Sequence, residues 1–141
     1  MSQGGAMSEH QLYELVAAFM QLQYPNVVYR FDLAADLKLT VGQAAKHKKL
    51  HPRRGYPDLF IACPADYQDT YGRWHRANGL FLELKKDGEK LYKKDGKTFK
   101  TDHIREQAEM LELLRRFGYK ADFAIGYEDT IKKIKAYMPV L

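Results

Sequence analysis

The sequence predicts one α/β domain, in which a mixed central sheet is flanked by helices. Helix-type and strand-type segments alternate along the chain, a pattern that favours this class over all-α or all-β folds. With 141 residues, of which 45% are hydrophobic, the chain can bury a core without disulfide or metal support. The lone cysteine, Cys63, excludes an intramolecular disulfide and a multi-thiolate zinc site, and we interpret it as a small buried apolar residue.

The first half of the chain contains a helix, a short strand and a second helix. Apolar residues recur at helical spacing from Ser8, a candidate N-cap, until Pro25 ends the pattern. The β-branched and aromatic run 27–31 predicts a short strand. A short helix is expected from Thr40, another candidate cap, until Pro52. We expect residues 1–7 to be a flexible tail or cloning remnant and residues 8–141 to form the domain.

The second half contains the central strands. Two apolar runs of strand length, 58–63 and 80–85, flank a polar, aromatic-rich segment that we expect to be a loop. Glycines and charged residues in 86–100 predict an exposed hairpin or loop. The remaining elements are expected in the order helix 102–117, ended by Gly118, strand 121–126 and helix 128–137.

The charge balance and the missing motifs narrow the function. The chain has 23 Lys and Arg against 18 Asp and Glu, a net charge of +5, which is compatible with a polyanionic partner. No apolar run approaches the roughly 20 residues that span a bilayer, and no signal peptide is recognisable, so we expect a cytoplasmic protein without membrane contacts. A phosphate-binding Gly-rich loop, a nucleophile elbow and a dinucleotide fingerprint are all missing, so no nucleotide cofactor is expected.

Two carboxylates on the central strands are the strongest chemical signal. Side chains alternate faces along 80–85, which places Glu83 and Lys85 on one face. Asp58 begins the preceding strand, and pairing of the two strands would bring its carboxylate beside Glu83. Close carboxylates repel and attract a cation, and hard oxygen ligands favour Mg²⁺ or Mn²⁺. Such an ion beside an ammonium group suits phosphodiester hydrolysis. The alternative is an ordinary half-exposed strand with Glu83 and Lys85 on its solvated face.

Two helical residues extend this hypothesis. Gln107 falls within the apolar stripe of the helix 102–117, where a buried amide needs a partner. It either bonds to backbone or water, or reaches the strand face that bears Glu83 and Lys85. In the first helix Glu9 faces the apolar side and Glu14 the opposite side, so we prefer Glu9 as a third acid. A simple interaction of Glu9 with the helix dipole is the alternative.

Basic residues gather just before the proposed site and again in the polar segment between the central strands. Those expected to bind DNA phosphates are Lys46, Lys48, Lys49, Arg53, Arg54, Arg73 and Arg76. The lysines of 90–100 lie around the aromatic residues Tyr92 and Phe99, as expected for contacts to distorted DNA. For these lysines a solvated loop is nearly as good an interpretation. His47 and His51 have the i, i+4 spacing of metal ligands, but no third ligand is apparent.

Several of these motifs together resemble the VRR-NUC family of the PD-(D/E)XK nuclease superfamily, and most closely its short stand-alone phage and bacterial members. The resemblance rests on residues 54–59, on 79–85, and on 106–107 followed by 117–119. It implies a nuclease-like αβββαβ core and divalent-metal-dependent cleavage of DNA phosphodiesters. For stand-alone members it also implies a homodimer that acts on branched DNA such as four-way (Holliday) junctions, in the cytoplasm of a bacterial or phage-infected cell.

Matched residue by residue, the resemblance implies roles for the same positions. Asp58 and Glu83 would be metal ligands together with the carbonyl of Leu84, Lys85 would be the catalytic lysine, and Gln107 matches the glutamine of the helix after the core strands. Both Glu9 and Glu14 can be aligned with the glutamate that the family has in its first helix. Two rival functions stay open: a non-catalytic DNA-binding protein with a nuclease-like fold, and a nuclease of other specificity, such as a flap, restriction or exonuclease.

Overall fold

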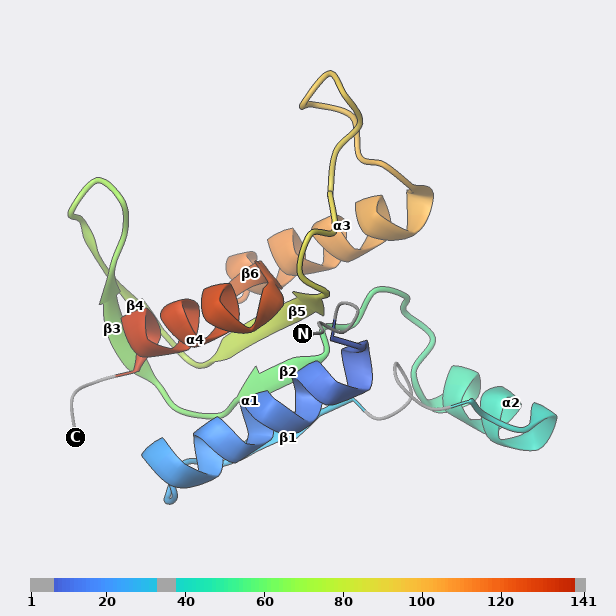
Figure 1. Cartoon of the computed structure of the whole chain (residues 1–141), viewed down its shortest axis with the longest axis horizontal. Coiled ribbons are helices and arrows are strands. Elements are labelled where there is room, and N and C mark those ends of the chain that lie inside the picture. Colours follow the sequence, from blue (N-terminus) through green and yellow to red (C-terminus); the bar gives the residue numbers. More distant parts are fainter. Residues whose placement is uncertain (1–6, 33–37, 139–141) are drawn as a thin grey trace, which may run out of the picture.

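A mixed four-stranded sheet forms the centre of the protein (Figure 1). The computed structural model describes residues 7–32 and 38–138. The strand order is β1-β2-β5-β6; β2 pairs antiparallel with β1 and β5, and β6 runs parallel to β5. The strands are β1 (Tyr29–Phe31), β2 (Leu59–Ile61), β5 (Leu80–Lys85) and β6 (Lys120–Ile125). The predicted mixed sheet flanked by helices is therefore confirmed.

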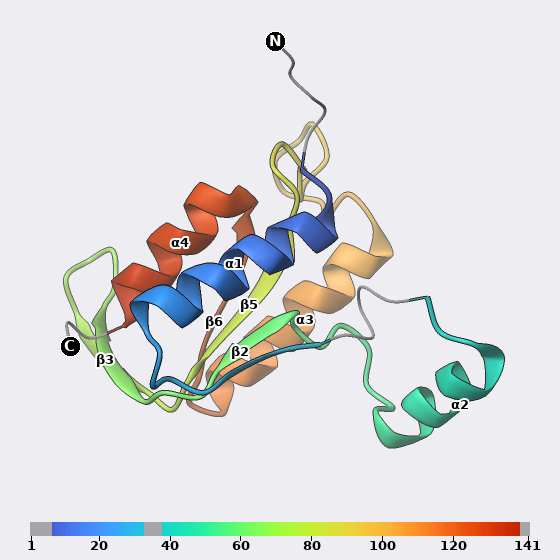
Figure 2. The same ribbon diagram turned by 60° about the horizontal axis from the view of Figure 1, so that its bottom comes forward.

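Helices cover both faces of this sheet (Figures 1 and 2). Helices α1 (Glu9–Gln23) and α4 (Gly126–Tyr137) pack on one face, where they enclose alternate residues of β5 such as Leu82 and Leu84. Helix α3 (Asp102–Arg116) covers the other face and packs on Phe81. The alternation of β5 thus separates two apolar clusters, as its period of two requires. No helix within the described residues is long and apolar enough to cross a membrane.

The helix starts follow the expected caps. The hydroxyls of Ser8 and Thr40 accept hydrogen bonds from the backbone N–H groups of Gln11 and Gln43, whose side chains bond back to the caps. Such reciprocal capping boxes satisfy backbone donors that a helix leaves unpaired at its start. The helix after Thr40, α2 (Val41–Leu50), has no buried residue and projects from the body (Figure 2).

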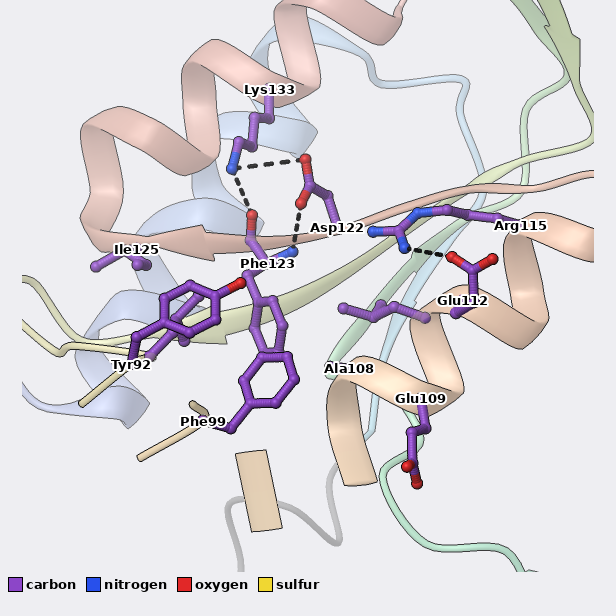
Figure 3. A pocket seen from close by; sticks show the side chains of 12 residues that line it. Tyr92, Phe99, Ala108, Glu109, Glu112, Arg115, Asp122, Phe123, Ile125 and Lys133 are labelled. Carbon is purple, nitrogen blue, oxygen red and sulfur yellow. Dashed lines mark hydrogen bonds and ion pairs between the residues drawn. The ribbon is translucent and has the colours of Figure 1, made fainter. Parts of the chain in front are cut away.

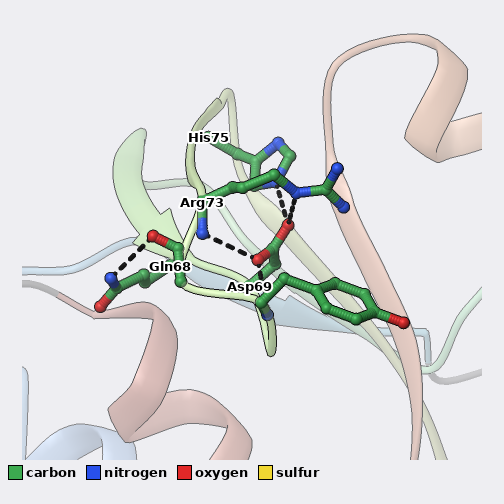
Figure 4. A network of polar contacts seen from close by, with 6 residues as sticks. Gln68, Asp69, Arg73 and His75 are labelled. Carbon is green, nitrogen blue, oxygen red and sulfur yellow. Dashed lines mark hydrogen bonds and ion pairs between the residues drawn. The ribbon is translucent and has the colours of Figure 1, made fainter.

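The expected loop between the central strands is wrong, because that segment folds into a second, two-stranded sheet. Strands β3 (Ala65–Gln68) and β4 (Trp74–Ala77) pair antiparallel. Their turn is held by the Asp69 carboxylate, which accepts hydrogen bonds from the backbone N–H groups of Tyr71 and Arg73, each at 2.9 Å (Figure 4). The strands are mostly exposed, so they lack the apolar alternation that reveals a half-buried strand.

Element boundaries elsewhere differ by one or two residues. The strand predicted at 121–126 begins at Lys120, and α4 begins at Gly126 rather than at 128. The segment 86–100 forms a hairpin-like excursion with a bridge between Tyr92 and Phe99, as predicted. Residues 1–6 of the expected tail lie outside the described part of the chain, while Met7 is half-buried against the core. Cys63 is half-buried against the same core.

Candidate active site

Asp58 and Glu83 lie side by side at the adjoining ends of β2 and β5. Leu59 pairs with Leu82, and continuation of this antiparallel register by one residue sets Asp58 opposite Glu83. Both side chains are buried, with exposed fractions of 2% and 3%. Asp58 Oδ2 accepts a hydrogen bond of 2.8 Å from the backbone N–H of Leu84, which fixes its carboxylate against β5.

The electrostatics of this pair are unfavourable without a further positive charge. Glu83 Oε1 is enclosed and has no hydrogen-bond partner within residues 7–32 and 38–138. Burial, followed by the adjacent Asp58 carboxyl, raises the pKa of Glu83 well above its usual range, and the charge of Lys85 only partly opposes this. An unpaired buried carboxylate oxygen is costly, so a proton or a cation is needed there.

Lys85 and Gln107 complete the centre from the α3 side of the sheet. Lys85 Nζ donates a hydrogen bond of 2.7 Å to Gln107 Oε1, and both side chains are buried. The amide nitrogen of Gln107 in turn donates to His103 Nε2 at 3.2 Å. The expected contact between Gln107 and the strand face is therefore present. All six residues of β5 are buried, which removes the interpretation of Glu83 and Lys85 as a solvated face.

The structure distinguishes the two glutamates of α1. Glu14 is exposed, and its Oε1 lies 3.2 Å from His10 Nε2. Glu9 is half-buried, and its charge contributes to the raised pKa values of Glu83 and of Tyr13. Of the two glutamates of α1, Glu9 is therefore the one whose charge acts on the buried site.

Tyr13 is a residue of the site that the sequence interpretation missed. It is buried, its ring stacks on Phe31 with a centroid distance of 5.2 Å, and its hydroxyl oxygen is enclosed without a hydrogen-bond partner among the described residues. Burial and then the Asp58 carboxylate raise the pKa of this phenol. A signal existed, since Tyr13 follows Glu9 by four residues and so shares its helix face.

The chain that links the basic residues to Asp58 packs closely against α3 at Gly55. Lys46, Lys48 and Lys49 are exposed on α2, and Arg53 and Arg54 are exposed in the segment that follows. Gly55 then passes very close to α3 with a φ of +80°: a Cβ there would lie 2.8 Å from the Glu106 carbonyl oxygen. Only glycine fits that approach, so the chain between the basic residues and Asp58 is held against the helix that carries Gln107.

Arg73 and Arg76 lie elsewhere, on the β3–β4 sheet at the opposite end of β5 from Lys85 (Figure 1). Arg73 Nε is 3.0 Å from Asp69 Oδ2, which also lies 2.8 Å from His75 Nε2 (Figure 4). Arg76 is 3.4 Å from Asp66. The structure therefore does not bring these two arginines to the carboxylate pair, and each has an aspartate beside it.

Oxygen ligands for a metal are few but of the expected type. Within the described ranges no group of three or more His, Cys, Asp or Glu residues is arranged to hold a metal ion. The side-chain oxygen atoms available at this point are those of the Asp58 and Glu83 carboxylates, and the backbone N–H of Leu84 already donates to Asp58. The unpartnered Glu83 Oε1 and the all-oxygen donor set fit a hard divalent cation that keeps part of its water shell.

Comparison with known proteins bears on the fold. No protein-family model matches the sequence, and no curated protein matches it either. Among solved structures, a VRR_NUC domain protein aligns with a TM-score of 0.59 and 25% sequence identity, over 96% of this chain and 91% of that chain. The similarity thus extends over nearly the whole of both chains. The protein accordingly has the fold of the VRR-NUC family, a family of nuclease domains.

Proposed function

We propose that the protein is a Mg²⁺- or Mn²⁺-dependent endonuclease that hydrolyses phosphodiester bonds in branched DNA, such as four-way junctions, as a homodimer. The observation that carries this proposal is the convergence of Asp58 and Glu83 in one buried site, with an unpartnered carboxylate oxygen and the Lys85 ammonium alongside. The similarity to a VRR_NUC domain protein supports the nuclease class.

Asp58, Glu83 and the carbonyl of Leu84 would hold the divalent ion. When bound, the ion neutralises charge on the phosphate and makes a water molecule a better nucleophile near neutral pH. Its positive charge would also remove the repulsion between the two carboxylates, which Lys85 alone opposes only in part.

The other residues act on substrate and water. Lys85 presents its ammonium group to the negative charge that develops on the phosphodiester, and Gln107 holds that ammonium through its side-chain oxygen. Gln107 thereby acts as a positioning residue for Lys85. Glu9 assists from α1, from where its charge acts on Glu83.

The basic residues of α2 and of the segment after it would bind phosphates on the approach to the site. Lys46, Lys48, Lys49, Arg53 and Arg54 are all exposed, and the chain that follows them is held against α3 at Gly55, three residues before Asp58. Arg73 and Arg76, at the other end of β5, would reach only a distant arm of the substrate. Two such sites in a symmetric dimer would face opposing strands of a four-armed DNA, since the protein and the substrate would share a two-fold axis.

Cleavage assays with matched DNA substrates test the proposal. A labelled four-way junction, a flap and a linear duplex are incubated with Mg²⁺, Mn²⁺ or Ca²⁺, using the wild-type protein, Glu83→Gln and the control Glu14→Gln. We expect paired cuts in the junction with Mg²⁺ or Mn²⁺, their loss in Glu83→Gln and normal cutting by Glu14→Gln. Binding without cutting would support the non-catalytic alternative, and equal cutting of flap or duplex would support a different specificity.

A further inference from the structure

The segment Lys86–Lys100 carries charge that the proposed site does not use. It contains six lysines and three acids, and its net charge of +3 is a large part of the +5 of the whole chain. Two of the acids are engaged: Glu89 lies 3.7 Å from Lys85, and Asp95 is bonded within the turn. None of the six lysines has an ion-pair partner within residues 7–32 and 38–138. We call this segment the lysine hairpin.

The lysine hairpin has a defined backbone. The backbone N–H of Lys93 donates to the Thr98 carbonyl and that of Lys100 to the Leu91 carbonyl, each at 2.8 Å. These bonds pair the two arms of the excursion in the manner of a short antiparallel ladder. A solvated loop without structure would have no such cross-links, so the lysines on these arms are presented in a fixed arrangement.

The tip of the lysine hairpin is closed by one carboxylate. Asp95 Oδ1 accepts from the backbone N–H groups of Lys97, at 2.8 Å, and Thr98, at 2.9 Å, while Oδ2 accepts from the Thr98 hydroxyl at 2.6 Å. These bonds lower the pKa of Asp95. Gly96 supplies the positive φ, +71°, that the turn requires. Asp95 thus determines the shape of the tip, although its own charge opposes phosphate binding.

The base of the lysine hairpin rests on the body of the protein. Tyr92 and Phe99 stack with a centroid distance of 5.1 Å and form one wall of a pocket of about 450 Å³. The opposite walls come from α3 and β6, including Ala108 and Phe123 (Figure 3). The aromatic pair therefore sets the direction in which the tip points.

The position of the lysine hairpin relates it to the candidate active site. It begins directly after Lys85 and leads into α3, the helix that carries Gln107. It projects from the body on a different side from α2 (Figures 1 and 2). A DNA backbone lying across Glu83 and Lys85 would therefore meet two separate basic elements, α2 and the lysine hairpin.

We propose that the lysine hairpin is a preformed DNA-binding arm that contacts duplex phosphates beside the cleavage site, and that its fixed shape as well as its charge contributes to affinity. This inference rests on the proposed function, because it takes DNA as the partner. The geometry favours DNA phosphates because the lysines are unpaired, exposed along ordered arms and adjacent to the site.

Charge and shape can be tested by separate substitutions. The double variant Lys94→Ala plus Lys97→Ala removes two charges from the arm, and its matched control, Lys132→Ala plus Lys135→Ala, removes two exposed lysines from α4. Binding of a fluorescent four-way junction is titrated in Ca²⁺ at several salt concentrations. We expect the arm variant to reduce the salt slope by roughly one per lost phosphate contact, and the control to leave it unchanged.

Asp95→Ala provides the decisive comparison, because charge and shape predict opposite results. The substitution raises the net charge above that of the wild type, so a diffuse cloud of lysines would bind DNA more tightly. A preformed arm would bind about three- to tenfold more weakly, because its side chains and turn must now be ordered on binding. Circular dichroism should show an unchanged Tm, since the tip is exposed.

The outcomes separate this inference from the proposed activity. Tighter or unchanged binding by Asp95→Ala, or an unchanged salt slope in the arm variant, would overturn the role of the lysine hairpin while junction cleavage could still be observed. Weaker binding by both variants, with a wild-type protein that never cuts in Mg²⁺ or Mn²⁺, would support the arm and refute the nuclease. A wild-type protein that binds no DNA would refute both.

Discussion

Glu83→Gln should show how much the buried carboxylate pair lowers the free energy of unfolding. Burial and Asp58 raise the pKa of Glu83 in the folded protein, whereas the unfolded chain has the ordinary value near 4.5. Above that ordinary value the unfolded chain loses its proton and the folded metal-free protein keeps it. Stability from this group is therefore fully present at low pH and falls as the pH rises toward the folded pKa. Glutamine has no proton to lose, so the variant lacks this dependence.

The size of the effect follows from one proton. A single linked proton changes the free energy of unfolding by at most about 1.4 kcal/mol per pH unit, or about 2.7 kcal/mol between pH 5 and 7. At roughly 4 °C per kcal/mol for a chain of this length, the Tm of the wild type should fall by up to about 10 °C more than that of Glu83→Gln. A divalent ion at 100 times its Kd would raise the free energy of unfolding of the wild type by about 2.7 kcal/mol, and it would not raise that of Glu83→Gln.

Thermal unfolding followed by circular dichroism measures both quantities. The metal-free wild type, Glu83→Gln and the exposed control Glu14→Gln are compared from pH 5 to 7, and then at pH 7 with Mg²⁺ or Mn²⁺. All other ionisable groups are the same in the wild type and in Glu83→Gln, so the difference between these two proteins isolates Glu83. Parallel pH curves for wild type and Glu83→Gln, or an equal rise of both Tm values on addition of metal, would refute the electrostatic reasoning.

Three further variants probe the neighbours of the pair and the exposed lysines of α2. Lys85→Ala should abolish junction cutting while junction affinity stays almost intact, and a large loss of affinity in a binding titration would contradict its assignment to the chemical step. Tyr13→Phe removes an enclosed hydroxyl that has no partner among the described residues, so the Tm should be kept. We expect its affinity for Mn²⁺ to fall about tenfold in calorimetric titration, because the phenol lies close enough to Asp58 to act on its carboxylate; an unchanged Kd would make Tyr13 a packing residue only. Lys48→Ala plus Lys49→Ala should weaken junction binding and flatten its salt dependence by roughly one per lost contact; an unaltered slope would leave α2 as a solvated helix.

The central part of the site could be predicted from the sequence, because residue spacing within each element and the pairing of neighbouring strands determine it. The period of two along β5 sets Glu83 and Lys85 on one face, and the strand pairing then sets Asp58 opposite Glu83. Gln107 was recognisable as an amide within an apolar helical stripe, a position that requires a polar partner. Each inference needed only the spacing of residues within one element and the pairing of two neighbouring strands.

Features that depend on exposed side chains, or on contacts between elements distant in the sequence, could not be predicted from residue spacing. The β3–β4 sheet is held by the Asp69 turn and by few buried residues, so it has no periodic apolar signal. Tyr13 belongs to the apolar face of α1 by its spacing, and only the packing of α1 against the sheet places its hydroxyl beside Asp58. The shape of the lysine hairpin likewise depends on the hydrogen bonds of Asp95, whereas composition alone predicts an exposed hairpin or loop without specifying its shape.

The distribution of buried polar side chains gives an independent reason to place the chemistry at the end of β5. Among the described residues, the buried polar or charged side chains are Asp58, Glu83, Lys85, Gln107 and Thr130. The Thr130 hydroxyl donates a 2.7 Å hydrogen bond to the Gly126 carbonyl within its own helix and so has a partner there. The other four meet in one place, where apolar residues of similar size would have stabilised the fold at lower cost. A stability requirement alone would not place three ionisable groups there, whereas the proposed binding of a cation and a phosphodiester would use all three.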